Sequence, residues 1–168
     1  MKLYFSGFSL KNEQELFKEY LEKSDFIVSG FSYGAIKAVE YALDSHNRID
    51  KLQLFSPAFF NDKDTKYKRM QLMYFKKDPK LYCANFLKNS NFTKELVMQY
   101  FEMGTYEELY ELLHYPWTTE NLQKIKNKNI TLEVFLGAED KIINAQKAMN
   151  FFKEFGEVYY IKDKGHIL

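Results

Sequence analysis

The segment Ile27-Val28-Ser29-Gly30-Phe31-Ser32-Tyr33-Gly34 constrains the fold of this chain more than any other. An apolar run leads into Gly-x-Ser-x-Gly, and the residues that follow favour a helix. The pattern predicts a strand that turns sharply into a helix, with Ser32 at the apex. Side chains two residues before and two residues after such a serine would be crowded, and glycine at positions 30 and 34 relieves this. We therefore expect the Ser32 hydroxyl to project beyond the edge of a sheet.

Short apolar runs alternate with helical patterns over most of the chain. Five runs are predicted strands: Leu3–Ser6, Phe26–Ser29, Leu52–Phe55, Leu132–Leu136 and Val158–Ile161. Most are apolar throughout, as expected for a parallel sheet covered on both faces. Helices are predicted at 33–43 and 145–155, and Asn12-Glu13-Gln14-Glu15 indicates a capped helix start after the first strand. The alternation predicts one α/β domain over residues 1–168 with a five-stranded parallel sheet.

The alternation stops between Pro57 and Ile130. Four stretches in this region favour helices: 67–75, 81–88, 93–103 and 106–114. We interpret the region as a helical lid inserted after the third strand, at about residues 58–121, and call it the lid segment. Its apolar side chains are expected to line a tunnel above Ser32 or to pack the lid itself: Met70, Leu72, Met73, Phe75, Leu81, Phe86, Tyr100, Phe101 and Leu113.

The start of the lid segment is basic. Residues 62–80 carry seven basic and three acidic side chains, a local charge of +4 against +1 for the whole chain. A solvated helix face is one explanation, and a docking patch for an acidic partner or an anionic substrate is the other. The residues considered for contact with such a partner or substrate are Lys66, Lys68, Arg69, Lys76 and Lys77.

Composition excludes several classes of protein. A net charge of +1 excludes a strongly basic nucleic-acid binder. No apolar run approaches the ~18 residues that span a bilayer, and Met1–Phe5 favours a strand and is too short for a signal peptide. Cys83 is the lone cysteine, so we expect a reducing cytosol and no disulfide. Metal-ligand spacings and phosphate-binding glycine patterns are absent from the sequence, so neither a metal nor a nucleotide cofactor is expected.

Two residues near the carboxyl end can make Ser32 a nucleophile. A serine hydroxyl needs a base to take its proton, and that base needs an orienting acid. Asp140 follows the fourth predicted strand and His166 the fifth, so both loops open at the same sheet edge as Ser32. The backbone N–H groups of Phe8 and Tyr33 are the predicted donors to a developing oxyanion. Glu139 and Asp163 stay open as alternative acids, and His46 and His114 as alternative bases.

Taken together, these segments resemble the α/β hydrolases from end to end. The resemblance is carried by Ser6-Gly7-Phe8, Gly30-Phe31-Ser32-Tyr33-Gly34, Leu54-Phe55-Ser56-Pro57, Leu136-Gly137-Ala138-Glu139-Asp140 and Gly165-His166. Chain length, abbreviated topology and the basic lid resemble the short pimeloyl-[acyl-carrier protein] methyl ester esterases of biotin synthesis, known as the BioV type. This resemblance implies Ser32 as nucleophile, Asp140 as acid and His166 as base. It also implies a cytoplasmic carboxyl-ester hydrolase whose basic lid contacts acyl carrier protein and which frees the distal pimeloyl carboxyl group.

The chain departs from that family in three ways. Ser6-Gly7 stands where His-Gly is usual, the first strands are missing, and the sequence stops two residues after His166. If the strands run in sequential order with right-handed crossovers, all connecting helices cover one face of the sheet. We then expect a rerouted helix or a homodimer to cover the other face. Two alternative functions stay open: a general short-chain acyl esterase or thioesterase, and a non-catalytic acyl-carrier-binding protein.

Overall fold

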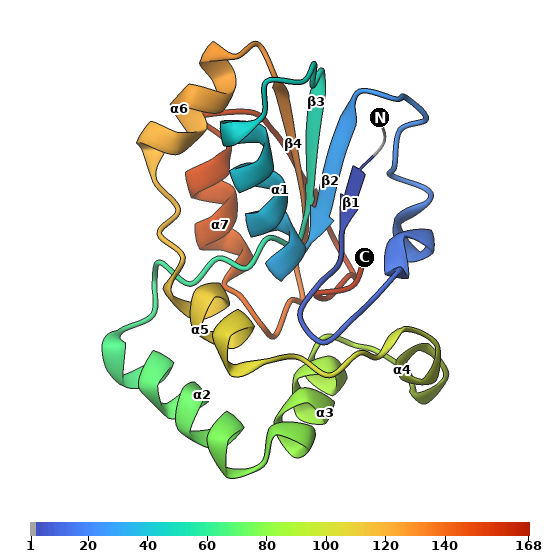
Figure 1. Ribbon diagram of the computed structural model, residues 1–168, viewed down its shortest axis with the longest axis vertical. Helices are drawn as coiled ribbons and strands as arrows, with labels where there is room; N and C mark the ends of the chain where they lie inside the picture. Colours follow the sequence, from blue (N-terminus) through green and yellow to red (C-terminus); the bar gives the residue numbers. More distant parts are fainter. Residues whose placement is uncertain (1–2) are drawn as a thin grey trace.

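Five parallel strands form one sheet in the sequential order β1-β2-β3-β4-β5 (Figure 1). The computed structural model describes residues 3–168, so the first two residues of the predicted domain and of the predicted strand Met1–Phe5 lie outside the described part. The strands are β1 Leu3–Phe5, β2 Ile27–Phe31, β3 Lys51–Phe55, β4 Thr131–Gly137 and β5 Glu157–Ile161. Each lies within two residues of its predicted position, and the predicted α/β fold with a five-stranded parallel sheet is confirmed.

Three helices cover one face of this sheet: α1 Tyr33–Asp44, α6 Thr119–Asn127 and α7 Ala145–Phe152 (Figure 1). Alternate residues of β3 and β4, such as Leu54 and Val134, point to this face and are fully buried against α1 side chains such as Val39. This layer contains the larger of the two apolar clusters. Within residues 3–168, no helix is both long and apolar enough to cross a membrane.

The opposite face is covered by the chain between β1 and β2. This connection contains a short 3-10 helix, η1 Glu13–Phe17, and the Phe17 ring stacks on Phe55 with 4.7 Å between ring centroids. Since the strands run in sequential order, a connection on the opposite face has the opposite hand to those through α1, α6 and α7. The first connection therefore does not meet the condition of uniform right-handed crossovers, and with η1 it is the rerouted segment that was expected as one of two ways to cover this face. The sheet face is covered by this chain itself, and a homodimer stays a prediction.

The predicted capped helix at Asn12 is also wrong. Asn12 has a φ of 57° and its side chain makes no capping hydrogen bond. The helix is 3-10 and stops at Phe17, because the segment must lie flat across the strands to bury Phe17 while the Glu13 side chain turns inward. A longer α-helix would carry the following residues Tyr20 and Leu21 off the apolar surface that they cover.

The lid segment folds as four helices at the carboxyl ends of the strands (Figure 1). They are α2 Thr65–Lys77, α3 Pro79–Asn89, α4 Lys94–Tyr100 and α5 Tyr106–His114, and α6 begins within the last residues of the segment. Thr105 and Glu108 form a capping box at the start of α5. Helix α6 is an element that the sequence analysis missed. The division into domain and lid stays a prediction.

The connection between α4 and α5 is tied to the loop after β1. Leu10 and Phe101 form an antiparallel bridge. The backbone N–H of Lys11 donates to the carbonyl of Tyr100 at 2.8 Å, and the N–H of Glu102 donates to the carbonyl of Ser9 at 3.1 Å. One end of the lid segment and the loop after β1 are therefore joined by backbone hydrogen bonds.

Candidate active site

Ser32 occupies the sharp turn between β2 and α1. Its backbone has φ 53° and ψ −112°, a strained conformation for a residue with a side chain. A Cβ atom at Gly30 would lie 2.1 Å from the carbonyl oxygen of Gly34, and one at Gly34 would lie 2.0 Å from that of Phe5. Both glycines have negative φ, so close approach of backbone, rather than left-handed geometry, requires them. Gly34 is thus needed for contact with the end of β1, which adds a second reason to the crowding predicted from sequence.

A continuous chain of hydrogen bonds links Ser32, His166 and Asp140. The Ser32 Oγ lies 2.8 Å from His166 Nε2, and His166 Nδ1 lies 2.7 Å from Asp140 Oδ2. The side chains of His166 and Asp140 are fully buried, and Ser32 is 1% exposed. The turn at Ser32 therefore meets two loops that lie more than a hundred residues further along the chain, at the carboxyl edge of the sheet.

The Asp140 carboxylate is fixed by its own loop. Its Oδ1 accepts the backbone N–H groups of Ile142 at 2.7 Å and Ile143 at 3.0 Å, which leaves Oδ2 for the imidazole. The alternative acids Glu139 and Asp163 are both exposed and do not contact His166.

The alternative bases do not reach Ser32. His46 is exposed after the end of α1. His114 stacks on Tyr110 at the end of α5, with its Nδ1 2.9 Å from the carbonyl oxygen of Tyr110. Of the three histidines, the structure brings His166 alone to the serine.

The segment that carries His166 is held by contacts on several sides. The Ser56 hydroxyl donates to the His166 carbonyl at 2.6 Å, and both residues are completely buried. The N–H of Ile167 donates to the carbonyl of Ser90 at 3.3 Å, and Leu168 packs into the apolar cluster around Phe17. Sequence reasoning missed the role of Ser56, although it lies in the Leu54-Phe55-Ser56-Pro57 segment that ends β3.

The two predicted oxyanion donors are the backbone amides of Tyr33, directly after Ser32, and of Phe8, in the loop after β1. Tyr33 opens α1, and the first N–H groups of a helix have no acceptor within the helix. Phe8 lies in a turn in which the N–H of Leu10 donates to the carbonyl of Gly7 at 3.2 Å. In a trans peptide the N–H points opposite to the C=O, so the N–H of Phe8 points away from that turn. Among residues 3–168 this N–H has no hydrogen-bond acceptor.

A second polar cluster joins the residue after Ser32 to the lid segment. The Tyr33 hydroxyl donates to Glu111 Oε2 at 2.6 Å, and Lys37 Nζ lies 2.7 Å from the same oxygen. Burial, and then the hydrogen bond to Glu111, raise the pKa of Tyr33 to about 12. The phenol is therefore a protonated donor at neutral pH, and α5 is fastened to the start of α1.

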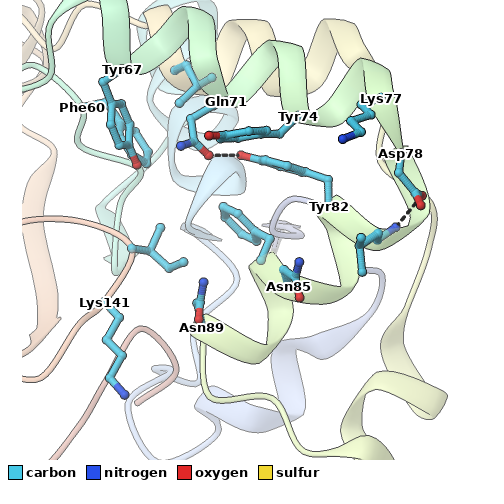
Figure 2. Close-up of a pocket in the computed structure, with 14 residues that line it drawn as sticks. Phe60, Tyr67, Gln71, Tyr74, Lys77, Asp78, Tyr82, Asn85, Asn89 and Lys141 are labelled. Atoms are coloured by element: carbon cyan, nitrogen blue, oxygen red, sulfur yellow. Dashed lines mark hydrogen bonds between the residues drawn. The ribbon is translucent and has the colours of Figure 1, made fainter.

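A pocket of about 540 Å³ lies between α2, α3 and the loop after β4 (Figure 2). Phe86 lines the pocket and also meets the His166 imidazole edge-on, with 6.4 Å between ring centroids. Ile142 lines it next to the Asp140 carboxylate. The remaining lining residues are Phe60, Tyr67, Gln71, Tyr74, Lys77, Asp78, Leu81, Tyr82, Asn85, Asn89, Leu113 and Lys141.

This pocket differs from the expected apolar tunnel. Leu81, Phe86 and Leu113 are the tunnel candidates that line it. Met70 and Met73 are exposed, since α2 turns them to solvent. Others are buried in the packing of the protein: Leu72, Phe75 and Tyr100. Amide and hydroxyl groups make up much of the lining, so the pocket presents both apolar side chains and hydrogen-bonding groups.

The five basic candidates all lie on α2, but on different sides of it. Lys66, Arg69, Lys76 and Lys77 are exposed and fall within about 100° of one another around the helix axis. Lys68 is half-buried and lies off this face. Lys77 is the one of the five that lines the pocket. We call the surface formed by Lys66, Arg69, Lys76 and Lys77 the basic face.

The sheet, the strained serine turn and the Ser–His–Asp arrangement at the carboxyl edge define the fold as that of the α/β hydrolases. No family model matches the sequence, and no curated protein matches it. Solved structures do match. E-2-(acetamidomethylene)succinate hydrolase superposes with a TM-score of 0.64 at 10% identity, over 99% of this chain and 84% of that one. MenH from S. aureus superposes with a TM-score of 0.63 at 16% identity, over 98% of this chain and 85% of MenH. BioG from Haemophilus influenzae superposes with a TM-score of 0.60 at 15% identity, over 99% of this chain and 88% of BioG.

Proposed function

We propose that this protein is a serine hydrolase that cleaves carboxylic esters. The observation that carries the proposal is the hydrogen-bonded chain from Ser32 through His166 to Asp140, which has the geometry of a general-base-activated nucleophile. The fold that the chain shares with solved hydrolases supports it.

The chemistry follows from these three side chains. His166 Nε2 takes the proton of Ser32 as Oγ attacks the ester carbonyl, while Asp140 holds Nδ1–H and stabilises the imidazolium. The N–H groups of Phe8 and Tyr33 donate to the oxyanion of the tetrahedral intermediate. His166 then gives its proton to the departing alcohol, which leaves an acyl group on Ser32. Water, deprotonated by His166, releases the acid and restores the serine.

The test is turnover of p-nitrophenyl butyrate. Ser32→Ala and His166→Ala should each lower kcat by about 10⁴-fold or more, because either change removes the activated nucleophile. Ser29→Ala is the matched control, because Ser29 is also buried. Its hydroxyl makes a long hydrogen bond to the backbone carbonyl of Leu3 in β1. Equal turnover in wild type and Ser32→Ala would remove Ser32 from the reaction, and binding of acyl carrier protein without turnover would instead support a non-catalytic role.

The finer proposal is that the substrate is pimeloyl methyl ester on acyl carrier protein, as the sequence resemblance implies. The basic face suits an acidic carrier, because opposite charges steer association. The side-chain amides that line the neighbouring pocket suit the amide-containing arm that tethers a carrier-bound acyl group. BioG is among the solved structures with this fold. A cytoplasmic location, inferred from the lone and buried Cys83, belongs to the same proposal.

Charge reversal separates this substrate from a general short-chain ester or thioester. Arg69→Glu with Lys76→Glu should lower kcat/KM for the carrier-bound methyl ester by about tenfold or more at low salt and leave p-nitrophenyl butyrate unaffected. The control reverses Lys126 and Lys153, which are exposed on α6 and just after α7. Equal rates in both double variants on the carrier substrate would contradict docking at the basic face. Faster turnover of a small thioester than of the carrier-bound ester would favour the general acyl esterase or thioesterase.

A further inference from the structure

Glu13 is a fully buried acid that takes no part in the proposed reaction. Its side chain is 0% exposed. Oε1 accepts the backbone N–H of Gly7 at 2.8 Å and the hydroxyl of Tyr4 at 2.9 Å. Oε2 is also buried and has no hydrogen-bond partner among residues 3–168. An incompletely paired buried carboxylate is costly, so its presence calls for a reason beyond the packing of η1.

The position of Gly7 supplies that reason. The peptide before Gly7 is held by Glu13 through its N–H, and the peptide after Gly7 is held by Leu10 through its C=O. This second peptide contains the N–H of Phe8. With both neighbouring peptides fixed, the direction of the Phe8 N–H is fixed as well.

We propose that Glu13 is a positioning residue that aims the Phe8 N–H at the oxyanion by anchoring the Gly7 amide. The inference rests on the proposed serine hydrolase function and deepens it. In this chain Ser6-Gly7 opens the loop, and Glu13, six residues further on, folds back to hold it.

Tyr4 is a second donor to the same oxygen and offers a control. Burial, and then the Glu13 carboxylate, raise the pKa of Tyr4, so its hydroxyl stays protonated and donates. If Glu13 served to fasten η1 to the sheet, the bonds to Tyr4 and Gly7 would matter alike. If it aims the Phe8 amide, the bond to Gly7 matters for catalysis and the bond to Tyr4 matters for stability.

The experiment compares a p-nitrophenyl ester with its thionoester, in which sulfur replaces the carbonyl oxygen. Sulfur is a weak hydrogen-bond acceptor, so the thionoester gains little from oxyanion donors. Glu13→Ala should lower kcat for the oxygen ester by about 10²-fold, as expected when a donor is misplaced by roughly 1 Å, and should slow the thionoester much less. Glu13→Gln keeps an acceptor for the Gly7 N–H and should restore the oxygen-ester rate to near wild type. Tyr4→Phe should lower thermal stability and leave the ratio of the two rates unchanged.

Equal losses on both esters in Glu13→Ala, or unchanged rates with a lowered melting temperature, would overturn the inference. If Glu13→Ala does not fold, Glu13→Asp replaces it, because it keeps the charge and shortens the reach by one methylene. Ser32-dependent turnover in the wild type is measured in the same series. Its absence refutes the proposed function, whereas its presence with an insensitive Glu13 refutes the positioning role alone.

Discussion

Replacing Ser56 by alanine tests whether the imidazole is held through its own backbone. The Ser56 hydroxyl is the donor to the His166 carbonyl at 2.6 Å, and neither residue is exposed. Alanine leaves that carbonyl buried with its donor removed. The cost of an unsatisfied buried acceptor is about 1–3 kcal/mol. For a chain of this size, about 2 kcal/mol lowers the melting temperature by roughly 4–8 °C.

The effect on activity should exceed the effect on stability. His166 lies two residues before the end of the described chain, and Ser56, directly after β3, holds its backbone carbonyl. Release of that contact lets the imidazole move relative to Ser32 Oγ, and a displacement of about 1 Å costs on the order of 10² in rate. We expect kcat for p-nitrophenyl butyrate to fall by that factor at 25 °C, where the variant remains folded.

The assay pairs thermal unfolding with steady-state kinetics on Ser56→Ala and on Ser29→Ala. Ser29 is also buried and donates to a backbone carbonyl, but at 3.4 Å and away from His166. The Ser29→Ala protein should therefore be less stable than the wild type but have the same kcat. A Ser56→Ala protein with lowered stability and full kcat would refute the reasoning, because the histidine would then be held adequately by the other contacts.

Three further predictions concern the surroundings of Ser32. Phe86→Ala should remove the ring between the pocket and the imidazole, so kcat/KM for longer p-nitrophenyl esters should rise relative to the acetate; an unchanged chain-length profile would contradict this. Gly34→Ala should yield protein that is unfolded or without activity, since its Cβ would overlap the Phe5 carbonyl oxygen at 2.0 Å, and circular dichroism with wild-type melting would contradict it. Although burial opposes it, the hydrogen bond from Lys37 lowers the pKa of Glu111 overall. A carboxyl group whose pKa is lowered by folding stabilises the folded state at any pH above its pKa in the unfolded chain, about 4.3. This stabilisation is lost as the pH falls through the pKa of the folded state. At pH 7 the melting temperature of the wild type should therefore be higher than that of Glu111→Gln. The difference in free energy of unfolding should be less than ~1 kcal/mol, because the ion pair is partly exposed. The two melting temperatures should converge near pH 3.

Local patterns predicted the elements that local forces decide. The largely apolar runs that became β3 and β4 are buried on both faces, as expected for parallel strands, although each contains one buried polar residue, Gln53 or Glu133. The turn at Ser32 carries glycines that backbone contact requires, and the loop positions of Asp140 and His166 follow from the parallel sheet. For this reason the sequence suffices to bring the three side chains to one edge.

Features decided by distant contacts could not be predicted. Asn12-Glu13-Gln14-Glu15 reads as a helix start, but the contact of Glu13 with Gly7 and Tyr4 overrides the local preference. Met70 and Met73 look like pocket residues until the orientation of α2 is known. Ser56 carries no signal of its own in sequence, because its partner lies 110 positions further along the chain.

The backbone bridge between Leu10 and Phe101 couples the loop after β1 to the lid segment. The loop that carries the Phe8 amide is hydrogen-bonded to the connection between α4 and α5, so a displacement of one would also displace the other. Any outward displacement of that connection to admit a large substrate would therefore also move the Phe8 N–H, which is a proposed oxyanion donor. Such a substrate would then be hydrolysed only after the connection between α4 and α5 had returned to its position in this structure.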